Sequence, residues 1–125
     1  MANGQVVTNA GRAIVSNLVS GLGGTVPKWL GWGTGTTTPV AADTALQTPS
    51  AEARTVGVPT RTTTTVANDT VTITGTITSA STQAITELGV FDALVAGNLF
   101  AHAVFSALNL VPGDGLLFVF NWVIG

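Results

Sequence analysis

The last eleven residues constrain the fold more than any other part of the chain. The run from Gly115 to Gly125 places apolar side chains on both faces of an extended strand, interrupted only by Asn121. A strand that is apolar on both faces is typically covered on both faces. We therefore expect a central strand of a β-sandwich or barrel here, with Phe118, Phe120 and Trp122 in the internal core.

One helix is predicted, near the N-terminus. Thr8 or Asn9 can cap it, apolar side chains recur at helical spacing up to Leu22, and the glycines within residues 21–24 end it. We place the helix at residues 9–20, after an extended arm or first short strand at residues 1–7. Residues 1–25 are thus expected to form an N-terminal arm and helix ahead of the strands.

The remaining apolar segments predict strands. Residues 70–79 alternate between apolar side chains and threonines, which indicates a half-buried strand. A turn at Asn68 and Asp69 pairs it with residues 55–66 as a hairpin, although Gly57 and Pro59 limit how central that partner can be. Further strands are expected at residues 26–35, 85–92 and 98–106, and a turn at 111–114 leads into the final strand.

Together these elements predict an all-β fold. Five or six strands at short spacing after one short helix indicate an antiparallel β-sandwich or a jelly-roll-like domain. A chain of 125 residues suits one domain with a core of its own. We find no repeat and no domain boundary, so we expect residues 1–125 to form a single β-sandwich domain.

Tryptophans and glycines alternate in the segment Trp29-Leu-Gly-Trp-Gly-Thr-Gly35. Glycine-rich loops can bind phosphate, but no Lys-Ser/Thr pair and no βαβ unit accompanies this one, so neither nucleotide-binding pattern is met. Close backbone packing is the favoured reason for the glycines. Tryptophans among apolar neighbours usually serve as core or interface anchors, although Trp29, Trp32 and Trp122 also allow a sugar-stacking site.

A polar segment follows at residues 36–50, punctuated by Pro39 and Pro49. Its composition predicts a surface loop, and the same segment is a candidate arm that lies on a neighbouring subunit. The residues that we expect to contact another protein are Trp29, Leu30, Trp32, Thr36, Thr37, Thr38 and Pro39.

Charged side chains are sparse in this chain. Four basic and six acidic residues make up 8% of it and give a net charge of −2. The scattered basic residues form no patch for nucleic acid. A folded monomer of this mass exposes roughly 6,000 Å², where charges usually make up about a quarter to a third of the surface residues. Either a Thr/Ser/Asn-rich surface replaces them, or neighbouring protein covers much of the surface, which favours an oligomer or a lattice component.

The apolar residues are not gathered into membrane spans. They make up 46% of the chain, and the mean hydropathy is +0.51. The longest apolar run is well short of the about 20 residues that a helix needs to cross a bilayer, so we expect no membrane partner. The N-terminus lacks the pattern of a secretory signal. The absence of cysteine removes disulfides and thiolate chemistry, and it fits assembly in a reducing cytosol.

Few side chains could support catalysis. His102 is the only imidazole, which excludes a site with several histidines from one chain. A Ser-His-Asp grouping can be written with Ser106 and with Glu87 or Asp92, but no nucleophile-elbow motif accompanies it, and the neighbours of His102 favour a structural role. Glu87 and Asp92 are turn or hydrogen-bonding residues or calcium-type ligands, and calcium needs more oxygens than they supply. We expect no enzyme, no cofactor and no metal site.

Several stretches taken together carry a family resemblance. They are Val7-Thr-Asn-Ala-Gly-Arg-Ala13, Pro27-Lys-Trp-Leu-Gly-Trp-Gly-Thr-Gly35, Asp43-Thr-Ala-Leu46, and Glu87-Leu-Gly-Val-Phe-Asp92 with Leu99-Phe-Ala-His-Ala-Val-Phe105. This combination resembles small structural proteins of tailed bacteriophages, which sit in the virion as capsid decoration (cement) proteins or as tail-fibre and tail-associated components, and which are commonly trimeric. The resemblance covers nearly the whole chain. Its motifs are packing and turn patterns, so it identifies no active-site residue.

The resemblance implies a non-enzymatic virion protein. The leading hypothesis is a capsid decoration protein that is assembled in the host cytoplasm, trimerises, and binds the major capsid protein on the capsid exterior. Contacts of roughly 800 Å² per partner, repeated over a shell, would stabilise the head even if each were weak. A tail-fibre or tail-tip module is the less favoured location, and a host-glycan-binding module is the alternative from another class.

Overall fold

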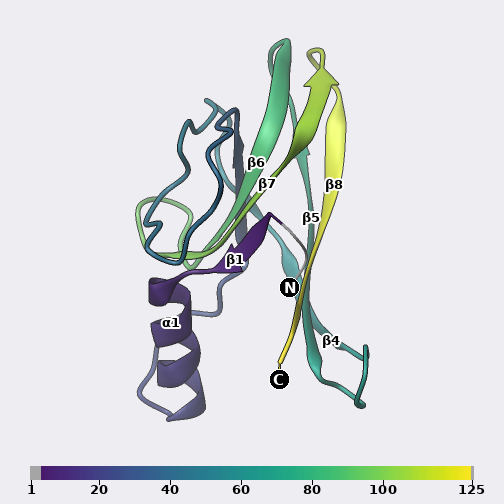
Figure 1. The fold of residues 1–125 in the computed structure, drawn as a ribbon. Coiled ribbons are helices and arrows are strands. Elements are labelled where there is room, and N and C mark those ends of the chain that lie inside the picture. Colours follow the sequence, from purple (N-terminus) through teal and green to yellow (C-terminus); the bar gives the residue numbers. More distant parts are fainter. Residues whose placement is uncertain (1–3, 125) are drawn as a thin grey trace.

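The computed structural model describes residues 4–124 and contains two antiparallel sheets and one helix (Figure 1). One sheet has five strands in the order β1-β7-β6-β2-β3, and the other has three in the order β4-β5-β8. The prediction of an all-β, sandwich-like fold is confirmed. The elements are β1 (Gln5–Val7), α1 (Asn9–Val19), β2 (Trp29–Gly33), β3 (Thr55–Val56), β4 (Val58–Thr62), β5 (Thr70–Thr78), β6 (Gln83–Phe91), β7 (Leu99–Leu110) and β8 (Gly115–Val123).

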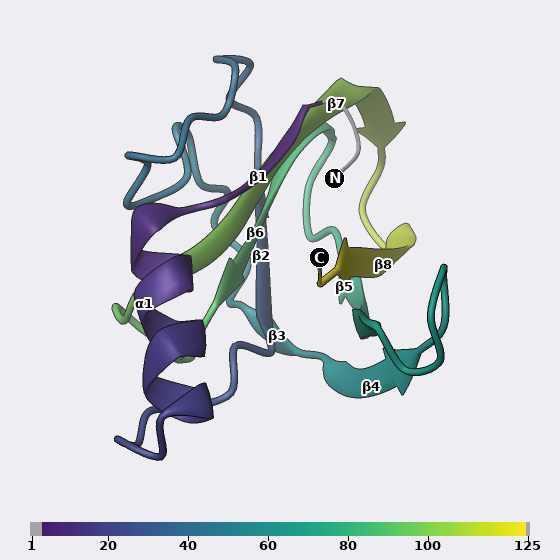
Figure 2. The same ribbon diagram turned by 60° about the horizontal axis from the view of Figure 1, so that its bottom comes forward.

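The N-terminal segment attaches to the larger sheet through β1 and α1. The predicted helix is confirmed to within one residue, and the Thr8 side chain caps it by accepting a bond from the Gly11 N–H at 2.9 Å. A Cβ atom on Gly11 would lie 2.2 Å from the Phe100 carbonyl oxygen, so only glycine allows α1 to approach β7 this closely. The helix lies beside β1 and β7 (Figure 2), and its buried Ile14 belongs to the main core. Residues 1–3 of the predicted arm lie outside the described residues.

The chain passes from one sheet to the other at Gly57. β3 pairs with β2 in the larger sheet, whereas β4 pairs with β5 in the smaller one, so the strand predicted at residues 55–66 is divided in two. The Gly57 N–H donates to the Lys28 carbonyl at 2.6 Å, and a Cβ atom at this position would lie 2.8 Å from Ile73 Cγ2. The crossing therefore depends on close backbone packing at a glycine.

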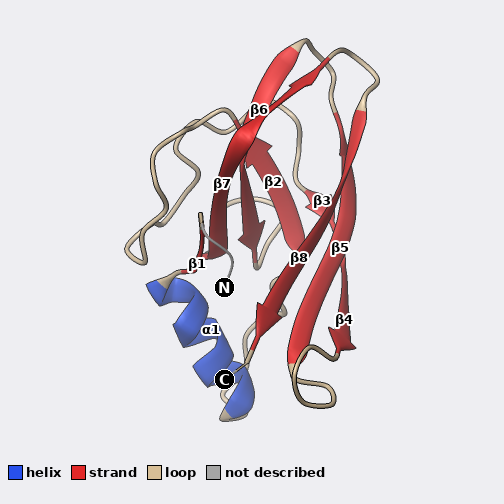
Figure 3. Ribbon diagram, turned by 45° about the vertical axis from the view of Figure 1, so that its right-hand side comes forward, coloured by secondary structure: helices blue, strands red, loops and turns tan. Residues whose placement is uncertain are grey.

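The final strand differs from its prediction. β8 forms an edge of the smaller sheet and, among residues 4–124, pairs only with β5, so it is not a central strand (Figure 3). Its inward face carries Phe120, which is buried, with half-buried Phe118 and Trp122. Its outward face is not covered, because Leu117 is 65% exposed and Val119 54% exposed. The apolar pattern on both faces predicts that both faces are buried, but only the inward face of β8 is buried.

Strict alternation along β7 is broken by a bulge. Val90 pairs with Ala101 and Phe91 with Leu99, which leaves Phe100 without an opposite residue on β6. Phe100 therefore turns into the space between the sheets, where its ring meets Phe120 edge to face at 6.1 Å. Leu99 instead packs with Phe91 in a separate cluster. The strand predicted at residues 98–106 also continues further, to Leu110.

The main core lies between the two sheets. It comprises the buried residues Val7, Ile14, Leu30, Trp32, Ile73, Ile77, Ile85, Leu88, Val90, Phe100, Ala101, Leu110 and Phe120. The β5–β6 and β7–β8 connections both cross between the sheets at one end of the molecule (Figure 1), where Ser79 exchanges main-chain bonds with Gly113 and Asp114. No helix within residues 4–124 has the length and apolar character needed to cross a bilayer.

Candidate functional site

Three ionisable side chains meet on the outer face of the larger sheet. Glu87 comes from β6, His102 from β7 and Asp43 from the loop between β2 and β3. The two ring nitrogens of His102 each lie 2.8 Å from a carboxylate oxygen, Nε2 from Glu87 and Nδ1 from Asp43. Glu87 has no exposed surface, and His102 is buried as well.

Glu87 also holds the long loop against the sheet. Its carboxylate accepts bonds from the main-chain N–H groups of Gly35 and Thr48, each at 2.8 Å, and of Gln47 at 2.9 Å. The predicted surface loop at residues 36–50 is therefore attached to its own chain at both ends. A Cβ atom on Gly35 would lie 2.5 Å from a Glu87 oxygen, and one on Gly33 2.2 Å from the Thr48 carbonyl. Close backbone packing as the reason for these glycines is confirmed.

The hydrogen bonds outweigh burial in setting the acidity of both carboxyl groups. Burial raises the pKa of Glu87, but the bonds from the Thr48 and Gln47 amides and from His102 lower it further, and the pKa lies below its usual value. Burial likewise opposes the bonds that Asp43 accepts from His102 and from the Val40 amide, and the pKa of Asp43 is also lowered. Both groups therefore favour the folded state when they are ionised.

Acid is expected to destabilise the fold through this cluster. A carboxyl group whose pKa is lower in the folded chain stabilises it fully above the unfolded value of about 4, and the stabilisation is lost as the pH falls through the folded value. Urea unfolding at pH 6, 4 and 3 should show a decreasing free energy of unfolding. A variant combining Asp43→Asn with Glu87→Gln should show a shallower decrease. Equal pH dependence in both proteins would contradict this assignment.

The cluster does not assemble the Ser-His-Asp grouping considered above. Both nitrogens of His102 are already bonded to Glu87 and Asp43. Asp92 instead accepts bonds from Asn98 and closes the loop between β6 and β7, and Ser106 is exposed beside β8. Within residues 4–124 no three His, Cys, Asp or Glu side chains are placed to hold a metal ion. His102 links two strands and a loop through these bonds, as expected of a histidine with a structural role.

The predicted protein-contact residues are divided between the core and the surface. Leu30 and Trp32 lie in the core, and Trp32, which is 2% exposed, donates its indole N–H to Glu52. Trp29 is half-buried and packs against the cluster of Leu46, Phe91 and Leu99. Neither Leu30 nor Trp32 can therefore offer much surface to a neighbour or a sugar. Surface for a partner remains on the exposed Thr36, Thr37 and Thr38 and on the half-buried Pro39.

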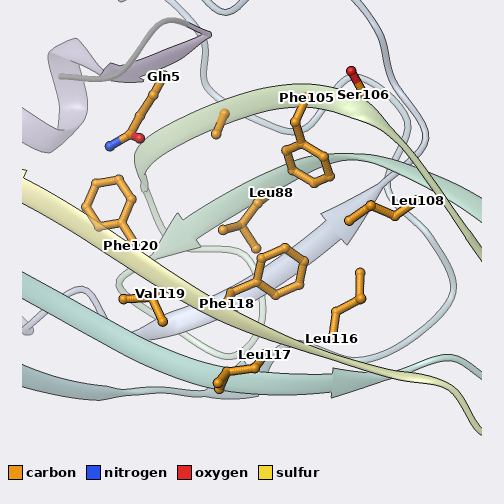
Figure 4. Close-up of a pocket in the computed structure, with 11 residues that line it drawn as sticks. Gln5, Leu88, Phe105, Ser106, Leu108, Leu116, Leu117, Phe118, Val119 and Phe120 are labelled. Atoms are coloured by element: carbon orange, nitrogen blue, oxygen red, sulfur yellow. The ribbon is translucent and has the colours of Figure 1, made fainter.

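An apolar groove runs along the free edge of β8 (Figure 4). It has a volume of about 570 Å³ and lies between β8 and the second half of β7. Its lining contains no charged side chain and consists of Gln5, Leu88, Ala103, Phe105, Ser106, Leu108 and the run Leu116, Leu117, Phe118, Val119 and Phe120. The groove was not predicted. The sequence does contain a feature that indicates such a surface: residues 105–124 carry a single charged residue, Asp114.

The groove and the buried cluster differ in what they can do chemically. In the cluster of Glu87, His102 and Asp43, both imidazole nitrogens and both Glu87 oxygens are bonded, so the cluster stabilises the fold, and Asp43 reaches the surface in a small pocket beside Thr37 and Thr38. The groove is open and apolar, so it suits the burial of another apolar surface. Comparison with known proteins adds nothing to this distinction, because no protein-family model, curated protein or solved structure matches the chain.

Proposed function

We propose that this chain is a non-enzymatic structural protein of a phage virion, acting as a capsid decoration protein. In this role it assembles with copies of itself, as a trimer by analogy with the proteins that it resembles, and binds the major capsid protein on the outer capsid surface. The observation that carries the proposal is the uncharged groove beside β8, flanked by the exposed side chains of Leu117 and Val119. Exposed apolar surface of this kind is typical of proteins that are covered by other proteins.

The loop at residues 36–50 supports a second contact surface. Its ends are bonded to Glu87, so Thr36, Thr37 and Thr38 are displayed on a fixed backbone. A fixed loop loses little conformational entropy when it binds, which favours association. Many such contacts, repeated over a shell, would stabilise the head even if each contact were weak. We therefore assign the loop to the capsid protein and the groove to other copies of the chain.

Binding to capsid shells that lack the protein tests this proposal. The purified chain should co-sediment with the shells, raise the temperature at which they open, and appear by cryo-electron microscopy at local three-fold positions. Combined Thr36→Lys and Thr38→Lys substitutions should weaken binding, whereas Thr60→Lys on exposed β4 provides a matched control. Shells that fail to bind the protein would contradict the proposal. Density confined to the tail would favour a tail-fibre or tail-tip role instead.

A further inference from the structure

Within residues 4–124 the two sheets have four edge strands, and only one of these is open to pairing. β1 has three residues and β3 has two, which is too short to recruit another strand. β4 carries Pro59 and Arg61, and both residue types discourage pairing at an edge. β8 has nine residues, with no proline and no charge. Natural proteins usually protect edges of this length and apolar character, so an unprotected one indicates a pairing surface.

The direction of the free main-chain groups on β8 follows from two hydrogen bonds. The Asn121 carbonyl accepts from the Gln5 side chain at 3.1 Å, so it points away from β5. The Ile124 N–H donates to the Asp69 carbonyl at 2.9 Å, so it points toward the β5 side. Along a strand, the N–H and C=O groups of successive residues point alternately to the two sides. The N–H and C=O groups of Gly115, Leu117 and Val119 therefore face the open edge, where no other residue of 4–124 bonds to them.

We propose that β8 pairs, antiparallel, with β8 of a second copy of this chain, so that the three-stranded sheets of two copies join into one. This inference rests on the proposed self-association. A two-fold contact joins two single copies or two trimers, so it adds a surface to the one that would build a trimer. Main-chain groups in a row require an extended backbone as their partner. A second copy supplies one with free groups at the same spacing, and neither strand carries a charge that would repel the other.

The register of the pairing depends on which main-chain groups of β8 are already hydrogen-bonded within the chain. Because the Asn121 carbonyl is bonded to Gln5, the free stretch runs from Gly115 to Val119 and is centred on Leu117. A two-fold axis at Leu117 places this residue opposite its own copy and Gly115 opposite Val119. Side chains on the inward face then also meet across the axis, with Leu116 opposite Phe118. Half-buried Phe118 and Leu116 would gain cover, and the grooves of the two copies would close against each other.

Cysteine substitution tests this register, because the chain has no cysteine of its own. Two Leu117→Cys copies would have Cα atoms about 5.5 Å apart across the axis, within the range of about 4.4–6.8 Å that a disulfide spans. Val119→Cys is the matched control: the residue is on the same strand and face and has similar exposure. Its two copies would lie about 14 Å apart, four residues out of register. Under mild oxidation Leu117→Cys should cross-link and Val119→Cys should not. Equal cross-linking of both, or of neither, would overturn the register.

Light scattering of the full chain tests the pairing itself. Leu117→Lys, at an exposed position, should halve the mass of the wild-type assembly, whether a dimer becomes a monomer or paired trimers become single ones. Val58→Lys on exposed β4 should leave the mass unchanged. Circular dichroism would show that both variants are folded. A trimer whose mass Leu117→Lys does not change would overturn the β8 pairing while leaving the proposed virion role intact. A wild-type monomer would overturn both the pairing and the self-association, and shell binding would still decide the role on the capsid.

Discussion

Replacing Glu87 with glutamine is expected to lower the free energy of unfolding by about 3–5 kcal/mol, the usual cost of removing one partner of a buried ion pair. The carboxylate is completely buried, bridges to His102 and accepts three main-chain N–H bonds from the loop. Glutamine has the same shape but offers one oxygen instead of two, and its amide hydrogens would face N–H donors. Both the charge and half of the acceptors are lost together.

Urea unfolding of Glu87→Gln at pH 7 measures this effect, with Glu52→Gln as the control. Glu52 also accepts three bonds, from the Trp32 indole, the Ala80 amide and the Gln83 side chain, but it is only half-buried. Water can replace part of what it loses, so a smaller change of about 1 kcal/mol is expected. If the two substitutions had equal effects, the buried cluster would not be the main attachment of the loop.

Trp32→Ala is expected to have an effect of similar size, about 3–5 kcal/mol, because it removes the largest side chain of the core and leaves a cavity. The indole lies between the sheets and meets the Phe118 ring edge to face at 6.2 Å. It also donates a hydrogen bond to Glu52 at 3.1 Å, which alanine cannot replace. The loss should therefore include packing and polar contributions.

Thermal or urea unfolding of Trp32→Ala and Trp29→Ala compares two tryptophans on the same strand. Trp29 is half-buried and packs on the smaller cluster with Leu46, Phe91 and Leu99, so its replacement should cost clearly less. A larger effect at Trp29 than at Trp32 would mean that the main core does not depend on Trp32. The comparison also decides whether the loss of any binding activity in a Trp32 variant reflects unfolding.

Local patterns in the sequence were sufficient to predict most strands and the helix. The threonine alternation of β5 and the cap at Thr8 act over a few residues, and the structure confirms both. The edge position of β8 could not be found in this way, because it depends on which strands pair across the sheet rather than on the strand itself. The bulge at Phe100 likewise depends on the register between β6 and β7.

The buried cluster was only partly accessible from sequence. His102 and Glu87 lie on neighbouring strands, and a structural histidine was predicted. Asp43, however, is separated from His102 by 59 positions in the chain, and nothing in its local sequence indicates that contact. The groove beside β8 was missed for the same reason, since its two walls come from different sheets. Sequence patterns describe faces of single elements, whereas both sites arise between elements.

The pairing of β1 with β7 has a consequence for how the chain is made. Val7 lies opposite Ala101, and β5 pairs with β8 at residues 115–123, so neither sheet can be completed until those late segments have left the ribosome. Non-local pairing of this kind slows folding. Until then β1 has no partner strand and β5 is paired only with β4, so apolar side chains stay uncovered, and we expect the nascent protein to need a chaperone or rapid release to avoid aggregation.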